Sequence, residues 1–382
     1  MSVSPSARPG ADGTLGAADG TEPVVDLVVA VHTAQRPVAR AVASALDCQV
    51  PVRVTVVAHH VEPALIEANL ERVEVPDRSS VRVLALSDGT RSPAGPFNLG
   101  LDAATARLVA VMGSDDMLAP GALDSWVALQ ERTGAAAVVA RLAHAGAGTV
   151  SAGRTVPTPP ARPFRTTGLD GVRDRLSYRS APLGLLERST LDSLGLRFTP
   201  GLEVGEDVEV VTRLWFSGAP VAFDRRGPAY LVQDDAGDRV TYVSRPVVDE
   251  LEFVRRIVTA DWFRGYAVGQ RAAVGVKMLR IHVFGVVGNR EPGFWDAAER
   301  SALARVAQAV LDAAPGCERV MSRADRAVLD AVLDTSVPVD ELVARARTRR
   351  RHGRLATLVP RDLRMVLARE APLRLMAASV LV

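Results

Sequence analysis

Between residues 24 and 143, short apolar runs alternate with segments of helical periodicity, and this alternation constrains the fold more than any other feature. The apolar runs are rich in β-branched residues, which is typical of buried strands. We predict strands at 24–31, 52–58, 81–87, 107–113 and 135–143, with helices between them at 37–46, 62–73, 95–105 and 120–134. Five strands separated by helices indicate an α/β fold with a largely parallel sheet.

The pattern changes twice after residue 143. Residues 144–180 are predicted as a long loop rich in Pro and Arg. Strand and helix signals then return, with a helix predicted at "GEDVEVVTRLWFSG", and from about Pro246 the pattern is almost entirely helical. The start of the chain is rich in Gly, Ala, Pro and Ser, which predicts disorder. We therefore expect a disordered leader over 1–23, an α/β domain over 24–240 and an α-helical C-terminal domain over 246–382.

The composition is that of an ordinary folded soluble protein, with 48% hydrophobic and 24% charged residues. No apolar run reaches the 18 residues or so that a membrane-spanning helix needs, and the N-terminus lacks the pattern of a signal peptide. A cytoplasmic location is the resulting expectation. The cysteines, Cys48 and Cys317, match no metal-binding or redox spacing, so we predict two buried thiols.

The net charge is only +2, but arginines gather at the C-terminus, where ten Arg and two acidic residues lie between Arg345 and Arg374. One interpretation is a packed helical domain with a solvated basic face. The other is peripheral contact with anionic lipid at the inner face of the cell membrane, which would suit a lipid-linked or cell-envelope acceptor. Nucleic-acid binding is disfavoured, because the whole chain is nearly neutral and aromatic residues make up only 4%.

Polar side chains follow three of the predicted strands, at the edge where open α/β sheets bind ligands. The first strand is followed by His32–Arg36, the second ends in His59 and His60, and the fourth ends in Ser114–Asp116. Neither a Gly-x-Gly-x-x-Gly fingerprint nor a Walker loop is present, which disfavours a dinucleotide-binding fold of the usual type.

Asp115 and Asp116 allow two interpretations. Adjacent carboxylates at a strand end can bind Mg²⁺ or Mn²⁺ through hard oxygen ligands, and the metal would then neutralise a diphosphate leaving group. Alternatively, the two acids solvate a turn and cap the following helix. His59 and His60 are equally open: a structural histidine is one interpretation, and contact with a base or phosphate is the other.

A second acidic cluster lies in "GLEVGEDVEVV", at the start of a predicted helix. Acids favour a helix N-terminus through the helix dipole, which is the structural interpretation. The functional interpretation is a general base that takes a proton from an acceptor hydroxyl. Further along, Arg239 lies in the predicted loop 233–239, and it would meet a pyrophosphate if that loop closes over the site.

Taken in order, these features resemble the family 2 glycosyltransferases of the GT-A fold over roughly residues 24–235. Four segments carry the resemblance: "VVAVHTAQRPVARAVASAL", "VRVTVVAHH", "FNLGLDAATARLVAVMGSDDMLAPGAL" and "GEDVEVVTRLWFSG". The resemblance implies a Rossmann-like, largely parallel sheet. It also implies metal-assisted, inverting transfer of a sugar from a nucleotide-diphosphate sugar to an acceptor hydroxyl, in cell-envelope or surface polysaccharide biosynthesis.

The resemblance also implies roles for individual residues. Asp207 would be the catalytic base, with Glu206 beside it, and Asp115 and Asp116 would hold Mg²⁺ or Mn²⁺ and the diphosphate. The remaining donor-binding residues implied are Thr33, Arg36, His59, Asn98 and Arg239. The expected partners are the nucleotide sugar and a glycan or lipid-linked acceptor.

Several positions depart from the family pattern. A histidine, His32, replaces the usual proline after the first strand, and the Asp that commonly contacts the nucleobase falls near Ala58 or His59. Gly113 stands where the first Asp of the acidic motif is common, and Phe97 where a basic residue is usual. These departures leave open a catalytically weak or silent GT-A domain that acts as a binding or scaffold partner. A nucleotidyltransferase ranks last, because "HTAQRPVAR" lacks the Gly-rich loop it would need.

Overall fold

The computed structural model describes residues 13–15, 22–146, 155–233 and 244–381. They form two compact units. The α/β unit contains the described residues up to Thr158 together with 165–169 and 180–233. The helical unit contains 159–164, 170–179 and 244–381. This division differs from the expected one, because 159–164 and 170–179 join the helical unit. Arg175 explains the difference: its guanidinium donates hydrogen bonds to the carbonyl oxygens of Pro160 and Arg369, the latter 194 residues away.

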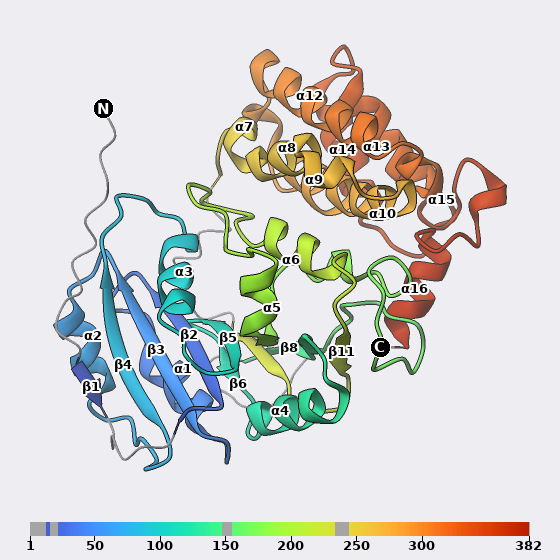
Figure 1. Ribbon diagram of the computed structural model, residues 1–382. Helices are drawn as coiled ribbons and strands as arrows, with labels where there is room; N and C mark the ends of the chain where they lie inside the picture. The colour runs from blue at the N-terminus through green and yellow to red at the C-terminus, as the bar shows by residue number, and fades with distance from the viewer. Residues whose placement is uncertain (1–12, 16–21, 147–154, 234–243, 382) are drawn as a thin grey trace. The chain divides into compact units, whose positions relative to one another are not determined.

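An eight-stranded sheet forms the centre of the α/β unit, in the order β1-β4-β3-β2-β5-β10-β7-β11 (Figure 1). Strands β2 to β5 run parallel, β10 runs antiparallel between β5 and β7, and β11 is parallel to β7. The strands span Gly13–Leu15 (β1), Val25–Val31 (β2), Val52–His59 (β3), Ser80–Leu86 (β4), Leu108–Gly113 (β5), Ala137–Ala140 (β7), Gly184–Glu187 (β10) and Val221–Asp224 (β11). Part of the expected disordered leader is therefore ordered: β1 pairs antiparallel with β4.

The predicted strand 135–143 is two strands in two sheets. Ala137–Ala140 (β7) pairs with β10 and β11, whereas Leu142–Ala145 (β8) joins a four-stranded sheet of order β6-β12-β8-β9. The other members of this smaller sheet are β6 (Met117–Leu118), β9 (Thr155–Val156) and β12 (Tyr230–Gln233). The prediction of one strand was wrong because an unbroken apolar run does not reveal that its partners change at Arg141.

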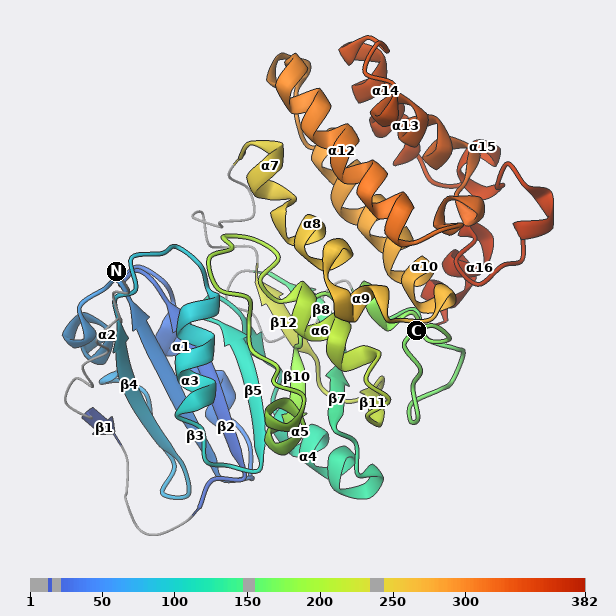
Figure 2. The same cartoon turned by 45° about the horizontal axis from the view of Figure 1, so that its top comes forward.

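Helices cover both faces of the large sheet, with α1 and α3 on opposite sides of β2 and β3 (Figures 1 and 2). Gly100 of α3 permits close packing on β2, since a Cβ atom there would lie 2.3 Å from Cγ1 of Val28. On the other face, α1 buries Val38, Ala41 and Val42 at helical spacing. The helices of this unit are α1 (Val38–Leu46), α2 (Pro63–Leu70), α3 (Ala94–Asp102), α4 (Ala122–Thr133), α5 (Arg188–Ser193) and α6 (Val208–Trp215).

The second unit is helical, as expected, and α12 packs against α8 and α13 within it. Its α-helices are α7 (Val247–Glu250), α8 (Glu252–Thr259), α9 (Asp261–Arg264), α10 (Val268–Lys277), α11 (Phe284–Gly288), α12 (Ala297–Ala313), α13 (Arg323–Leu333), α14 (Val339–Arg349), α15 (Leu355–Leu358) and α16 (Pro372–Val380). Short 3₁₀ turns and one π-helical segment, Met278–Val283, connect or extend them.

Two further predictions concern the cysteines and the membrane-spanning helices. Cys48 and Cys317 are both free thiols and both buried, which confirms the prediction, and burial raises the pKa of each to about 12. Across the described residues, no helix combines the length and the apolar character that crossing a bilayer requires.

Candidate active site

Asp115 lies in the turn directly after β5, in the middle of the large sheet, and the structure brings it to Arg36. Strands β2 and β5 are parallel neighbours with Ala30 opposite Gly113, so the segments that follow them begin side by side. The Nη1 atom of Arg36 lies 2.7 Å from Oδ2 of Asp115, and both side chains are buried. Arg40, one helical turn further on, donates a hydrogen bond of 2.7 Å to the backbone oxygen of Asp115. Two of the predicted site residues therefore form an ion pair.

Asp116 is held by a residue for which the local sequence gives no signal. The hydroxyl of Tyr230 donates a 2.7 Å hydrogen bond to Oδ2 of Asp116, and the same hydroxyl accepts one of 3.1 Å from the backbone N–H of Gly113. The backbone N–H of Gln233 donates to Oδ1 of Asp116 at 3.2 Å. Burial and the Asp116 charge raise the pKa of Tyr230 well above its ordinary value, so the hydroxyl remains a donor. Tyr230 is 114 residues from Asp116, which is why no sequence spacing pointed to it.

The carboxylates of the acidic pair lie close to the backbone of Gly113, in the space that a side chain at this position would need. A Cβ atom at this position would lie 2.9 Å from Oδ2 of Asp116 and 3.0 Å from Oδ1 of Asp115. Both carboxylates thus converge on the place where residue 113 has no side chain, and a third acid there would crowd them. A pair of carboxylates is a set of hard oxygen donors, and this chemistry fits Mg²⁺ or Mn²⁺.

Thr33 organises the turn that presents Arg36. Its Oγ1 atom accepts a hydrogen bond of 3.0 Å from the backbone N–H of Gln35 and also contacts Oε1 of that residue. The backbone carbonyl oxygen of Thr33 accepts a hydrogen bond of 3.3 Å from the backbone N–H of Arg36. A threonine that hydrogen-bonds two residues ahead forms a local turn. The predicted contact of Thr33 with the donor nucleotide stays a prediction.

Asn98 holds a distant segment against α3. Its Nδ2 atom donates a hydrogen bond of 2.9 Å to the carbonyl oxygen of Phe198, and its Oδ1 atom accepts a hydrogen bond of 2.8 Å from the backbone N–H of the same residue. The ring of Phe97, at the position where the family often has a basic residue, packs on Phe198 with ring centroids 5.0 Å apart. Asn98 therefore positions the chain that leads to Glu206 and Asp207; its predicted contact with the donor stays a prediction.

Glu206 and Asp207 stand at the start of α6, where Asp207 is the residue that precedes the first helical one. The backbone N–H of Thr199 donates a 2.9 Å hydrogen bond to the carbonyl oxygen of Glu206, which closes the loop before the helix. Burial and the neighbouring charge of Asp207 raise the pKa of Glu206 to about 8. A carboxyl group with a pKa near neutrality beside a second carboxyl group is an arrangement suited to proton transfer.

His59 ends β3 and lies against Asp88, which follows β4. The Nε2 atom of His59 is 2.9 Å from Oδ1 of Asp88, and that of His60 is 3.2 Å from the same oxygen. Burial lowers the pKa of His59, although the hydrogen bond with Asp88 opposes this effect. Burial alone would raise the pKa of Asp88, but hydrogen bonds from His59 and Thr90 outweigh it and lower that pKa to about 2. Asp88 was not among the predicted site residues; its only sequence signal is the Asp-Gly turn it opens.

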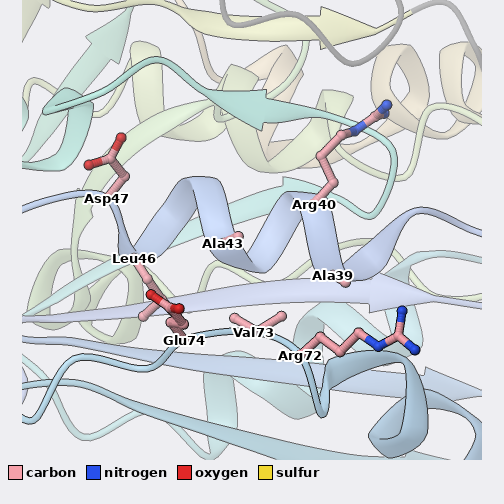
Figure 3. A pocket seen from close by; sticks show the side chains of 8 residues that line it. All are labelled: Ala39, Arg40, Ala43, Leu46, Asp47, Arg72, Val73 and Glu74. Carbon is pink, nitrogen blue, oxygen red and sulfur yellow. The ribbon is translucent and has the colours of Figure 1, made fainter.

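Arg239 lies outside the described residues, so its predicted contact with the pyrophosphate stays a prediction. A cavity of about 630 Å³ lies beside α1, and none of the predicted site residues lines it (Figure 3). Arg40 is among its lining residues, and Figure 3 shows this side chain extending from α1 away from Arg72 and Val73. The other lining residues are Ala39, Ala43, Leu46, Asp47 and Glu74.

Comparison with known proteins gives consistent results. Residues 26–195 match the model of glycosyl transferase family 2. The succinoglycan biosynthesis protein ExoO of Rhizobium meliloti (strain 1021) is 28% identical over 247 residues, which cover 61% of this chain and 69% of ExoO.

Solved structures extend the likeness beyond the matched residues. S. aureus TarS 1-349 in complex with UDP-GlcNAc superposes with a TM-score of 0.66 at 16% identity, over 85% of this chain and 91% of that one. Its complex with UDP gives a TM-score of 0.62 at 15% identity, over 86% and 92% of the two chains. At this level of identity the likeness concerns the fold, and it confirms the expected fold class.

Proposed function

Because this chain belongs to glycosyl transferase family 2 and has the GT-A fold, we propose that it transfers a sugar from a nucleotide-diphosphate donor to a hydroxyl group of a growing surface polysaccharide. Two relatives support this proposal. ExoO is described as a succinoglycan biosynthesis protein, and TarS has been solved with UDP-GlcNAc. We propose inversion at the anomeric carbon and assistance by Mg²⁺ or Mn²⁺.

The observation that carries the proposal is the pair of carboxylates at the end of β5. The carboxylates of Asp115 and Asp116 converge beside Gly113; Arg36 holds the first and Tyr230 holds the second. In the proposal these two acids hold the divalent cation, which when bound offsets the charge of the leaving diphosphate. In the proposal the guanidinium of Arg36, which lies beside Asp115, also binds an oxygen of the diphosphate, since guanidinium groups favour phosphate as a partner.

The chemical step needs one proton acceptor. In the proposal, a carboxylate oxygen of Asp207 takes the proton of the acceptor hydroxyl while that hydroxyl oxygen bonds to the anomeric carbon. The bond from the anomeric carbon to the diphosphate oxygen breaks, and its electron pair leaves with the nucleoside diphosphate. Glu206, whose pKa is raised, keeps its own proton at neutral pH and so limits the negative charge next to the base. Thr33, Asn98 and His59 are assigned to the donor side.

Asp207→Asn tests the assignment of the base. After a screen of nucleotide sugars by thermal shift, we expect this variant to bind the selected donor as wild type does. Transfer should fall by about 10²–10⁴-fold, because general base catalysis contributes on this scale. Glu209→Gln is the matched control, since Glu209 lies on the same helix and pairs with Arg213 at 3.7 Å. An Asp207→Asn variant that turns over at the wild-type rate would show that another group is the base.

The alternative function is a GT-A domain that binds a nucleotide sugar without turning it over. The ion pair between Arg36 and Asp115 favours it, since a guanidinium already compensates one of the two carboxylates. Release of nucleoside diphosphate separates the two functions. The enzyme releases it in the presence of acceptor glycan and Mn²⁺, whereas a silent domain binds the donor and releases none.

We also propose that the helical unit contacts anionic lipid through its C-terminal segment. Leu355, Leu363 and Leu367 are 70%, 61% and 72% exposed, and arginines surround them in the sequence. Exposed leucines among cations are the combination that binds interfaces of anionic bilayers.

Co-sedimentation with phosphatidylglycerol vesicles should be strong at low salt and weak at high salt. The double variant Leu363→Ser, Leu367→Ser should lose it, whereas Leu65→Ser, an exposed leucine of α2, should keep it. Equal binding by all three proteins would contradict the proposal.

A further inference from the structure

Three potential metal ligands meet at the carboxyl ends of β3 and β4. His59 is the last residue of β3 and lies opposite Leu86, the last residue of β4, in their parallel register. The backbone N–H of His60 donates a 2.9 Å hydrogen bond to the carbonyl oxygen of Leu86, which fixes the chain just beyond the strand. Asp88 follows two residues later. The sheet itself therefore brings together side chains that are 28 residues apart in sequence.

The distances between the ligand atoms suit one small cation. Oδ1 of Asp88 lies 2.9 Å from Nε2 of His59 and 3.2 Å from Nε2 of His60, and all three atoms lie within 4.8 Å of one another. Around tetrahedral Zn²⁺, with bonds of about 2.0–2.1 Å, neighbouring ligand atoms are about 3.3 Å apart. The two contacts with Asp88 need to lengthen by only a few tenths of an ångström to reach that spacing.

The backbone at His60 is unusual. Its φ angle is 57°, in the left-handed region that only a few per cent of residues other than glycine adopt, with asparagine, aspartate and histidine the most frequent among them. Such strain persists where the surroundings fix it, and it is common at functional sites. Here the turn sets the imidazole of His60 beside that of His59, with ring centroids 4.2 Å apart.

The carboxylate of Asp88 is also fixed by its neighbours. Oδ1 accepts hydrogen bonds of 3.0 and 3.1 Å from the backbone N–H and the hydroxyl of Thr90. Gly95 leaves room on the other side, since a Cβ atom there would lie 2.2 Å from Oδ2 of Asp88. Nε2 of His60 also lies 2.8 Å from the carbonyl oxygen of Thr90. A bound metal would replace this contact and the contacts of both imidazoles with Oδ1 of Asp88.

We propose that His59, His60 and Asp88 bind a transition-metal cation of the Zn²⁺ class. Imidazole nitrogen is a preferred ligand of Zn²⁺, Co²⁺ and Ni²⁺, whereas Mg²⁺ and Mn²⁺ favour oxygen ligands such as the pair Asp115 and Asp116. His59 is buried while His60 and Asp88 are exposed, so the cation enters from solvent and keeps a coordination position for water or a ligand. This site contains neither acid of the pair after β5, although it shares His59 with the proposed donor side. Metal binding can be measured without a nucleotide, so its test is distinguishable from a test of the proposed transferase activity.

Co²⁺ is the probe that tests the site, because its visible absorption reports nitrogen coordination directly. The full chain, with any affinity tag removed and stripped by a chelator, is titrated with Co²⁺ and then with Zn²⁺. We expect one equivalent of Co²⁺ to give a visible band that one equivalent of Zn²⁺ removes. His60→Asn, which tolerates the left-handed backbone, and Asp88→Asn should each weaken Co²⁺ binding by about tenfold or more, the scale on which groups around a metal act.

Two controls locate the effect. His352→Ala removes an exposed histidine of the helical unit, and Asp102→Asn removes an exposed carboxylate of α3 that pairs with Arg197; both should bind Co²⁺ as wild type does. Circular dichroism shows whether each variant is folded. The inference is overturned if the folded wild type gives no band at one equivalent of Co²⁺, or if folded His60→Asn and Asp88→Asn bind Co²⁺ as tightly as wild type.

Discussion

The variant Tyr230→Phe tests how the acidic pair is held. It removes one hydroxyl from a fully buried ring and with it two hydrogen bonds, one to the carboxylate of Asp116 and one from the backbone N–H of Gly113. A hydrogen bond to a charged group contributes about 1.5–3 kcal/mol and a neutral one about 0.5–1.5 kcal/mol. Because both partners stay behind, we expect the α/β unit to lose about 2–4 kcal/mol of unfolding free energy.

This loss has a thermal and a functional readout. For a unit of this size, each kcal/mol of lost unfolding free energy lowers Tm by about 2–4 °C. The Tm of the α/β unit, measured by calorimetry, should therefore fall by about 5–15 °C. Residues that orient metal ligands typically affect metal affinity by about 10–100-fold, and we expect that loss of Mn²⁺ affinity. Tyr178→Phe, which removes a hydroxyl in the helical unit, should leave Mn²⁺ binding unchanged. A Tyr230→Phe protein with wild-type Tm and wild-type Mn²⁺ affinity would refute the reasoning.

Three further predictions concern stability. Glu206 binds a proton up to about pH 8 when folded but only to about pH 4.5 when unfolded, so its contribution to stability is lost as the pH rises between these values. Glu206→Gln should therefore have the same Tm as wild type at pH 5 and a higher Tm than wild type at pH 9. A variant whose Tm equals that of wild type at both pH values would contradict this. Gly100→Ala, whose new Cβ meets the buried strand β2, should cost about 1–3 kcal/mol in urea denaturation, whereas Gly285→Ala, which enters open space, should cost nothing. Asn98→Ala removes both hydrogen bonds to Phe198 and should cost about 1–3 kcal/mol; an unchanged midpoint would show that these bonds do not anchor the segment.

The sequence predicted the elements that depend on local pattern. β2, β3, β4 and β5 lie within a residue or so of their predicted ranges, because each is a β-branched run bounded by polar residues. Hydrophobic periodicity also found α1 and α4. The turn after β5 was placed correctly for the same reason, and the parallel pairing of β2 and β5 then brought Arg36 and Asp115 together.

The remaining features depend on partners that are distant in sequence. The chain changes sheets at Arg141 because β7 and β8 find different neighbours, and no local composition marks this change. Tyr230 reaches Asp116 only because β12 pairs with β6, which follows the acidic turn. Asp88 joins His59 only because β3 and β4 end at the same edge. In each case the position is set by tertiary pairing, which a single sequence does not show.

Calorimetric titration of nucleoside diphosphates with and without Mn²⁺ shows whether the acidic pair after β5 binds a metal and a diphosphate together. We expect Mn²⁺ to strengthen the binding of at least one of UDP, GDP, ADP and dTDP, and Asp115→Asn to abolish this gain. Asp102→Asn, an exposed acid of α3 that pairs with Arg197 at 2.8 Å, should keep it. If none of the four nucleotides binds with any divalent cation, or if Asp115→Asn retains the full gain, the acidic pair after β5 is not a metal-diphosphate site.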